Sequence, residues 1–273
     1  MSGPGRMLPL RRVDLIPAAR TTLAVLALAT SVACGTGGPR HLVPAGTGQP
    51  DVFLHDKGKA ALDDKKWATA REYFKEIVDN YPQSPLRPEA KLGLGDSYLN
   101  EGTTESYVLA TNEFKEFLTF YPTNARADYA QFHLALTHYK QMRAPERDQS
   151  ETKEALKEFD AFFERYPSSP LMPDVKAKWR ETRDRLSEAA YRVGLFYFRN
   201  RWYPGAIDRF RQVLKDDPGY TARDAVYFYL AESLVKTDNK AEALPYFEKL
   251  TQEFDKSVFL EDAKRRIGEL KIQ

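Results

Sequence analysis

Residue types that commonly carry out chemistry are sparse in this sequence. It has four histidines and one cysteine, and His133 and His138 are five positions apart, so they do not share a helix face as a metal-binding i, i+4 pair would. A single cysteine forms no intrachain disulfide. The carboxylates alternate with Lys and Arg, which is typical of solvated helix faces. The sequence therefore predicts no enzyme, no metal site and no cofactor.

The one cysteine, Cys34, stands at an informative position. Arginines and the apolar run Leu23–Leu28 precede it, with the small residues Ser31 and Ala33 just before it. This pattern predicts a bacterial export signal over residues 1–33, because the apolar run is far shorter than the ~20 residues of a spanning helix. A cysteine directly after such a signal resembles the lipidated cysteine of bacterial lipoproteins, and Gly35 after it favours the outer membrane. Ser31 replaces the Leu usual in that family, so ordinary cleavage after Ala33 is the alternative.

Residues 34–51 are rich in Gly and Pro and predict a flexible linker between a lipid anchor and a folded body. Its root-mean-square span is on the order of 20 Å. The net charge of the chain is +2, and residues 1–33 carry +3, which leaves −1 for the rest. A chain so close to neutrality has no basic field for nucleic acid, so no nucleic-acid partner is expected.

One phrase recurs five times and organises the rest of the chain. Each copy has an alanine, a Phe four residues later, and a helix-ending position seven residues after the Phe. Alanine and Phe at this spacing share a helix face, and a Pro after four of the copies ends the helix. An upstream small residue (Gly58, Gly95, Ala135, Gly194 or Ala231) accompanies each copy, so the unit is helix, turn, helix. The five Ala–Phe pairs are Ala70 and Phe74, Ala110 and Phe114, Ala155 and Phe159, Ala206 and Phe210, and Ala243 and Phe247.

This unit predicts an all-α, tetratricopeptide-like helical-hairpin solenoid with about five repeats and a C-terminal capping helix. Repeats 1–3 occupy residues 52–170, and repeats 4–5 with the capping helix occupy 171–273. Pro245 is expected to delay its helix until about Glu242. The expected helices span about 52–63, 66–80, 86–100, 104–120, 125–142, 150–165, 173–200, 221–236, 240–254 and 257–271. One further helix is expected to start near Pro204, between the seventh and eighth of these ranges.

Solenoids act through their surfaces, and three stretches carry more aromatic and arginine character than packing requires. These are Tyr129–Phe132, Tyr197–Tyr203 and Tyr227–Tyr229. Tyr, Trp and Arg dominate interface energetics, which favours partner binding. The alternative is that about half of each stretch is helix core.

Several motifs, taken in order behind a lipoprotein signal, resemble the BamD family of outer-membrane β-barrel assembly lipoproteins over about residues 52–255. They are Lys66-Trp67 ahead of Ala70, Tyr81-Pro82, Arg147-Asp148, Tyr166-Pro167, the helix from Lys178 through Arg185 to Tyr197, and Ala222-Arg223-Asp224-Ala225.

The resemblance implies a lipid-anchored scaffold on the periplasmic face of the outer membrane. Its partners would be the barrel-forming assembly subunit, other assembly lipoproteins and client outer-membrane proteins. Candidate contacts with the barrel-forming subunit are Arg199, Arg201, Trp202, Tyr203, Arg209 and Arg223, and candidate client contacts are Tyr98, Tyr129 and Phe132. The alternative is a periplasmic tetratricopeptide-repeat scaffold of the YbgF type, involved in envelope or peptidoglycan organisation.

Overall fold

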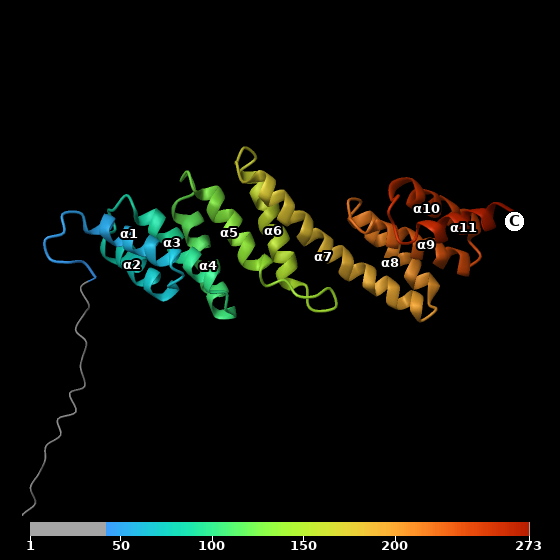
Figure 1. Ribbon diagram of the computed structural model, residues 1–273, viewed down its shortest axis with the longest axis horizontal. Coiled ribbons are helices and arrows are strands. Elements are labelled where there is room, and N and C mark those ends of the chain that lie inside the picture. Colours follow the sequence, from blue (N-terminus) through green and yellow to red (C-terminus); the bar gives the residue numbers. More distant parts are fainter. Residues whose placement is uncertain (1–41, 273) are drawn as a thin grey trace, which may run out of the picture. The chain divides into compact units, whose positions relative to one another are not determined.

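The computed structural model describes residues 42–272, and over that range the chain forms eleven α-helices and no β-strand (Figure 1). The all-α prediction is therefore confirmed. Cys34 and the predicted export signal lie outside the described residues. The helices are α1 Pro50–Asp63, α2 Trp67–Asn80, α3 Arg87–Glu101, α4 Thr104–Phe120, α5 Ala127–Tyr139, α6 Ser150–Arg165, α7 Met172–Arg199, α8 Tyr203–Asp216, α9 Arg223–Lys236, α10 Lys240–Glu253 and α11 Leu260–Ile272.

Successive helices pair as hairpins, and each hairpin packs on the next. The pairs are α1 with α2, α3 with α4, α5 with α6, α7 with α8, and α9 with α10, while α11 packs on α10. Tyr81, Tyr121 and Tyr166 each leave helical geometry directly before a proline, as the repeated Tyr-Pro dipeptide predicts. These features confirm a tetratricopeptide-like solenoid of five hairpins with a terminal helix. No helix within residues 42–272 is long and apolar enough to cross a membrane.

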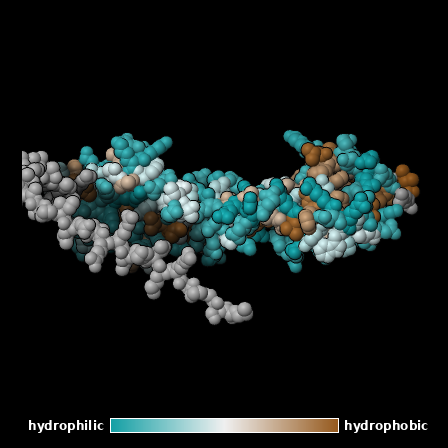
Figure 2. Space-filling view, turned by 90° about the horizontal axis from the view of Figure 1, so that it is seen from below, coloured by the Kyte–Doolittle hydropathy of each residue, from teal (hydrophilic) through white to brown (hydrophobic). Residues whose placement is uncertain are grey.

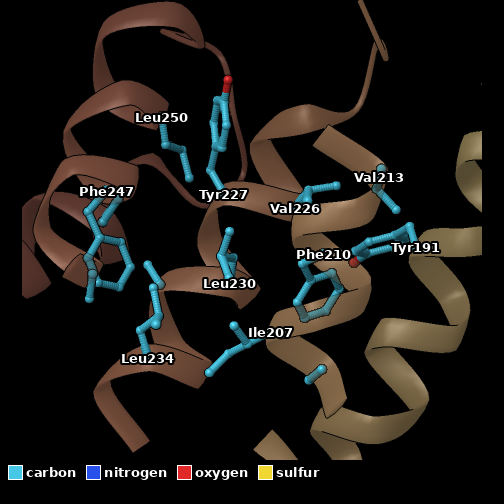
Figure 3. Packing of buried hydrophobic residues seen from close by; sticks show 14 of the residues in the cluster. Tyr191, Ile207, Phe210, Val213, Val226, Tyr227, Leu230, Leu234, Phe247 and Leu250 are labelled. Atoms are coloured by element: carbon cyan, nitrogen blue, oxygen red, sulfur yellow. The ribbon is translucent and has the colours of Figure 1, made fainter. Parts of the chain in front are cut away.

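The repeated Ala–Phe pairs form the core, as predicted. All five alanines and all five Phe rings are buried, in four clusters that each join neighbouring hairpins. The upstream glycines explain how the rings fit: a Cβ on Gly95 would lie 2.6 Å from the Phe114 ring. A Cβ on Gly194 would lie at the same distance from the Phe210 ring. Figure 3 shows Phe210, Tyr191, Leu230 and Phe247 in the cluster of the C-terminal repeats.

Filling one of these glycine sites is expected to destabilise the chain. Gly95→Ala improves helix propensity, yet its methyl group would overlap the Phe114 ring, so the free energy of unfolding should fall by about 1–3 kcal/mol. The control is Gly268→Ala in α11, where nothing lies within 4 Å of the new Cβ. That variant should gain about 0.5–1 kcal/mol. Denaturant titration measures both changes, and a stabilised Gly95→Ala would contradict the packing.

Helix α10, Lys240–Glu253, matches the predicted range 240–254. The expected delay of its start until about Glu242 does not occur, although Pro245 lies inside the helix. Glu242 and Ala243 both donate backbone N–H groups to the Asn239 carbonyl, which closes the first turn ahead of the proline. Pro245 and Ala241 are both exposed, so water can reach the carbonyl whose usual partner the proline removes.

A polar contact that the repeat pattern did not predict joins successive hairpins. In each case a serine lies in the turn that precedes a hairpin or α11. The serine hydroxyl donates to an aspartate in the first turn of the preceding hairpin. The same serine Oγ accepts the backbone N–H of the residue two positions later. The Ser84 hydrogen bond lowers the pKa of Asp51. The contacts are Ser84 to Asp51 at 2.7 Å, Ser169 to Asp128 at 2.6 Å and Ser257 to Asp224 at 2.6 Å.

The long helix α7 carries two apolar segments separated by a polar one. Val175 belongs to a cluster with α5 and α6, and Tyr191 belongs to the cluster of α8–α10. Between them, the buried residues of α7 are Thr182 and Ser187. The middle of α7 is therefore joined to its neighbours mainly through polar contacts.

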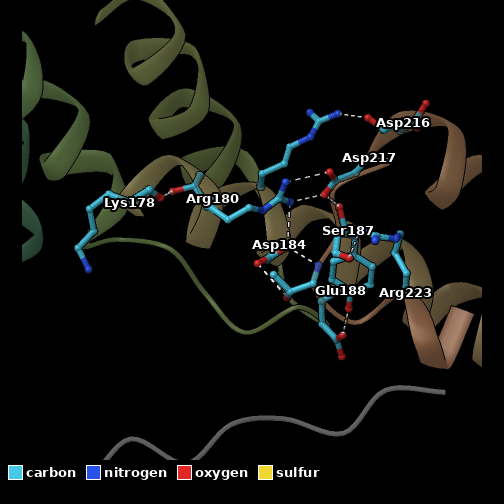
Figure 4. A network of polar contacts seen from close by, with 12 residues as sticks. Lys178, Arg180, Asp184, Ser187, Glu188, Asp216, Asp217 and Arg223 are labelled. Carbon is cyan, nitrogen blue, oxygen red and sulfur yellow. Dashed lines mark hydrogen bonds and ion pairs between the residues drawn. The ribbon is translucent and has the colours of Figure 1, made fainter. Parts of the chain in front are cut away.

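Those polar contacts centre on Asp217, at the end of α8 (Figure 4). Arg180 donates to both of its carboxylate oxygens, and Ser187 Oγ donates to Oδ2 at 2.6 Å. Nearby, Asp184 accepts from the Thr221 backbone N–H at 3.1 Å and from its hydroxyl at 3.0 Å. We call Arg180, Asp184, Ser187 and Asp217 the α7 joint.

The stretch ahead of α1 is partly packed. Leu42 and Val43, inside the predicted linker, lie against the first core cluster. Gly46 takes a positive φ of 86°, and Thr47 closes a turn onto the Pro44 carbonyl. The described part of the linker therefore contacts the first repeat.

Candidate functional site

The turn between α7 and α8 presents the aromatic and basic residues that the sequence singled out. Arg201 has a left-handed φ of 62°, which lets the Trp202 N–H bond the Tyr197 carbonyl at 2.9 Å and close the turn. Trp202 is 55% exposed, and its ring lies edge-on to Tyr197, with ring centroids 4.6 Å apart. Tyr203 packs edge-on against Phe198. The turn is therefore fixed while Trp202 still faces solvent.

Three of the predicted contact arginines are free to meet a partner. Arg199, Arg201 and Arg209 are exposed, and the contacts over residues 42–272 give none of them an ion pair or side-chain hydrogen bond. Arg209 precedes the buried Phe210 on α8. Unpaired arginines suit bidentate pairing with carboxylates of another protein.

Arg223 differs from these three. Its guanidinium pairs with Glu253 at 3.3 Å, donates to the Tyr220 carbonyl at 3.0 Å and lies 5.4 Å from the Phe254 ring centroid. These contacts tie the start of α9 to the end of α10. Its cation is already satisfied inside the chain, so Arg223 does not form one free cationic surface with Arg209.

The candidate client contacts lie mostly within the packing of the N-terminal repeats. Phe132 is buried against Phe159 and Phe162, so its ring is core. Tyr98 is half-buried, with the Arg71 guanidinium 4.6 Å from its ring centroid. Of the three candidates, Tyr98 and Tyr129 are therefore partly exposed, and Phe132 is not.

Tyr129 lies in a polar cluster between α3 and α5. Its hydroxyl donates to Asp96 at 2.9 Å, and its ring stacks on His133 at 3.8 Å with the Arg126 guanidinium 4.3 Å from its centroid. Burial raises the pKa of Tyr129, and the neighbouring Asp96 carboxylate raises it further, so the hydroxyl stays a donor at physiological pH. The cluster fixes α5 against α3, and Tyr129 stays partly exposed within it.

Residues 48–241 match the YfiO family, described as outer membrane lipoproteins, and this match covers most of the chain. The chain belongs to the YfiO family.

Curated relatives of this YfiO-family chain carry the name outer membrane protein assembly factor BamD. The protein of Caulobacter vibrioides is 26% identical over 222 residues, which are 81% of this chain and 72% of the relative. The protein of Rickettsia prowazekii is 26% identical over 219 residues, which are 80% of this chain and 86% of the relative. Among solved structures, the TPR2AB domain of yeast Sti1 in complex with pHSP90 is 13% identical, with a TM-score of 0.48, covering 82% of this chain and 84% of that one.

Val193 and Phe196 are among the exposed apolar residues that the sequence did not single out as contacts. Val193 and Phe196 lie on α7 and are 40% and 61% exposed. They are three residues apart and lie next to the aromatic run Tyr197–Tyr203, so the sequence alone is equally compatible with a buried helix face. The distinguishing signal is that Phe196 lies only two residues after Gly194, whose face turns toward Phe210.

Proposed function

We propose that this chain is a scaffold subunit of the outer-membrane β-barrel assembly machinery. Its membership of the YfiO family and its relatives named outer membrane protein assembly factor BamD support this function and favour it over a YbgF-type scaffold. A solenoid of helical hairpins whose sequence shows no catalytic pattern fits a binding role. Cys34 would carry the lipid that anchors the chain on the periplasmic face of the outer membrane.

Within this role, the C-terminal repeats would bind the barrel-forming subunit, and the chain would also meet other assembly lipoproteins. The observation that carries this proposal is that Arg199, Arg201 and Arg209, beside the exposed Trp202, are exposed and form no ion pair or side-chain hydrogen bond with any residue between 42 and 272. The N-terminal repeats would meet client outer-membrane proteins, through Tyr98 and Tyr129. The buried position of Phe132 makes it a support for that surface rather than a direct contact.

The test is purification of the tagged full chain from detergent-solubilised envelopes. The barrel-forming subunit should co-purify, and the N-terminal peptide should begin with a diacylglyceryl Cys34. Arg209→Glu should lower recovery of that subunit sharply, because a desolvated arginine facing a carboxylate is worth about 2–5 kcal/mol in binding. The matched control is Lys115→Glu on the exposed face of α4, which makes the same charge change.

Circular dichroism must show equal helicity and melting for both variants. Absence of the barrel-forming subunit from the wild-type preparation would refute the proposed function. If the subunit is recovered equally with Arg209→Glu and Lys115→Glu, the surface around Arg209 is not its docking site. An unmodified N-terminus at Cys34 would refute the lipid anchor.

A further inference from the structure

The second half of α7 leaves a short apolar stripe uncovered. Ala189, Val193 and Phe196 follow the i, i+4, i+7 spacing of one helix face. The opposite side of the helix, at Gly194, is buried against Phe210. Figure 1 places the α5–α6 loop and the α7–α8 turn on the lower side, and Figure 2, which views that side, shows apolar side chains among hydrophilic ones. An uncovered apolar face flanked by polar residues is typical of an interaction surface.

Two adjoining hollows flank Phe196. One, of about 550 Å³, lies between the α5–α6 loop and α7, with Pro145 and Val193 in its wall. The other, of about 460 Å³, continues toward the C-terminal end of α7, with Leu195 and Arg199 in its wall. Phe196 borders both hollows, together with the ion-paired Glu146 and Arg192, so the two hollows meet at this side chain.

The loop wall of these hollows is held in place by several contacts. Glu146 forms an ion pair with Arg192, and Arg185 donates to the Arg143 carbonyl at 3.2 Å. The Gln149 side-chain amide bridges the carbonyls of Ala144 at 2.8 Å and Arg147 at 3.0 Å. A wall fixed in this way lowers the ordering cost of binding.

The unpaired charge around the hollows is positive. Their two acidic residues are engaged, since Glu146 and Glu188 both pair with Arg192. Arg147 and Arg199 have no ion pair or side-chain hydrogen bond to any residue between 42 and 272. A partner that covers the stripe therefore gains from carboxylates at both ends of its apolar face.

We propose that this surface binds an amphipathic, acidic helix of a protein partner. Two apolar side chains one helical turn apart straddle Phe196 and enter the two hollows, because residues i and i+4 of a helix lie on one face. Carboxylates beside them pair with Arg147 and Arg199. This proposal rests on the proposed function in one respect: the helix belongs to a subunit of the assembly machinery.

Site-specific photocrosslinking in intact cells tests the occupant. Phe196→p-benzoylphenylalanine in the full chain should crosslink to an assembly subunit, and the mapped peptide should be an amphipathic helix with acidic flanks. The matched control is the same change at Phe120 on α4, which is similarly exposed, at 68% against 61% for Phe196. Crosslinks to lipid, to a second copy of this chain or to a basic segment would overturn the proposal, as would a yield no higher than at Phe120.

Binding measurements separate this proposal from the proposed function. Phe196→Glu should weaken co-purification of the crosslinked subunit about tenfold or more, as expected for the centre of an interface. Arg147→Glu should weaken it as well, because it places a like charge opposite the partner's carboxylates. Phe120→Glu should leave it unchanged. If the subunit does not co-purify with the wild-type chain, that result counts against the proposed function. Full retention in Phe196→Glu, with unchanged helicity, counts against this surface alone.

Discussion

Replacing Phe114 with alanine is expected to lower the free energy of unfolding by about 3–5 kcal/mol. The ring is fully buried between α3 and α5, where it fills the space left by Gly95 and meets His133 edge-on at 5.7 Å. Truncation removes that buried surface and leaves a cavity, because the glycine opposite has no side chain to fill it. Equilibrium denaturation in urea measures the change.

The same helix supplies the control. Phe120 lies six residues further along α4 and is 68% exposed, so Phe120→Ala should change stability by no more than about 0.5 kcal/mol. Both variants delete the same atoms, so their difference mainly reports burial. A cost below ~1 kcal/mol for Phe114→Ala, or equal costs for the two, would show that the repeated Phe is not the core of the hairpin.

The repeated core was predictable because its signal lies within single helices. Alanine and Phe four residues apart define one face, and five copies in register make chance agreement improbable. The helix-ending Tyr-Pro dipeptides are equally local. The confirmed parts of the fold, namely the hairpins, the buried rings and the terminal helix, all follow from such local patterns.

Contacts between residues far apart in the sequence were not predictable. The Ser84–Asp51 contact spans 33 residues, and both residue types are common in turns and helix starts, so nothing in the sequence pairs them. The same limit applies to Phe132 and Phe196. Each is a Phe in an aromatic helical stretch, yet the facing helices bury the first and leave the second exposed.

The second large effect is expected at the α7 joint. Asp217 is 4% exposed and accepts from Arg180 and Ser187, so Asp217→Ala leaves a part-buried guanidinium with Asp184 as its remaining carboxylate, 2.8 Å away. Removing one partner of a buried pair typically costs 3–5 kcal/mol. We expect about 3 kcal/mol, because Arg180 keeps some solvent contact. Urea denaturation measures this loss.

Asp216 provides the matched control. It is the neighbouring residue and is exposed, and within residues 42–272 its side chain accepts only from Gln212, four residues away on the same helix. Asp216→Ala should therefore cost no more than about 0.5 kcal/mol. Equal costs at the two positions would show that the joint contributes little and that the apolar clusters alone hold α7 to α8.

The stability that the α7 joint contributes is also expected to depend on pH. Burial disfavours the charged carboxylate, but the hydrogen bonds from Arg180 and Ser187 outweigh it, so the pKa of Asp217 lies below its usual value of 3.8. The ionised form is thus favoured in the folded chain, and its contribution is fully present above the unfolded pKa of about 3.9. It is lost as the pH falls through the folded pKa. Asp217→Asn cannot ionise, so its stability deficit relative to wild type should be constant near neutral pH and shrink below about pH 4. A deficit that stays constant down to pH 2 would show that the charge of Asp217 does not stabilise the joint.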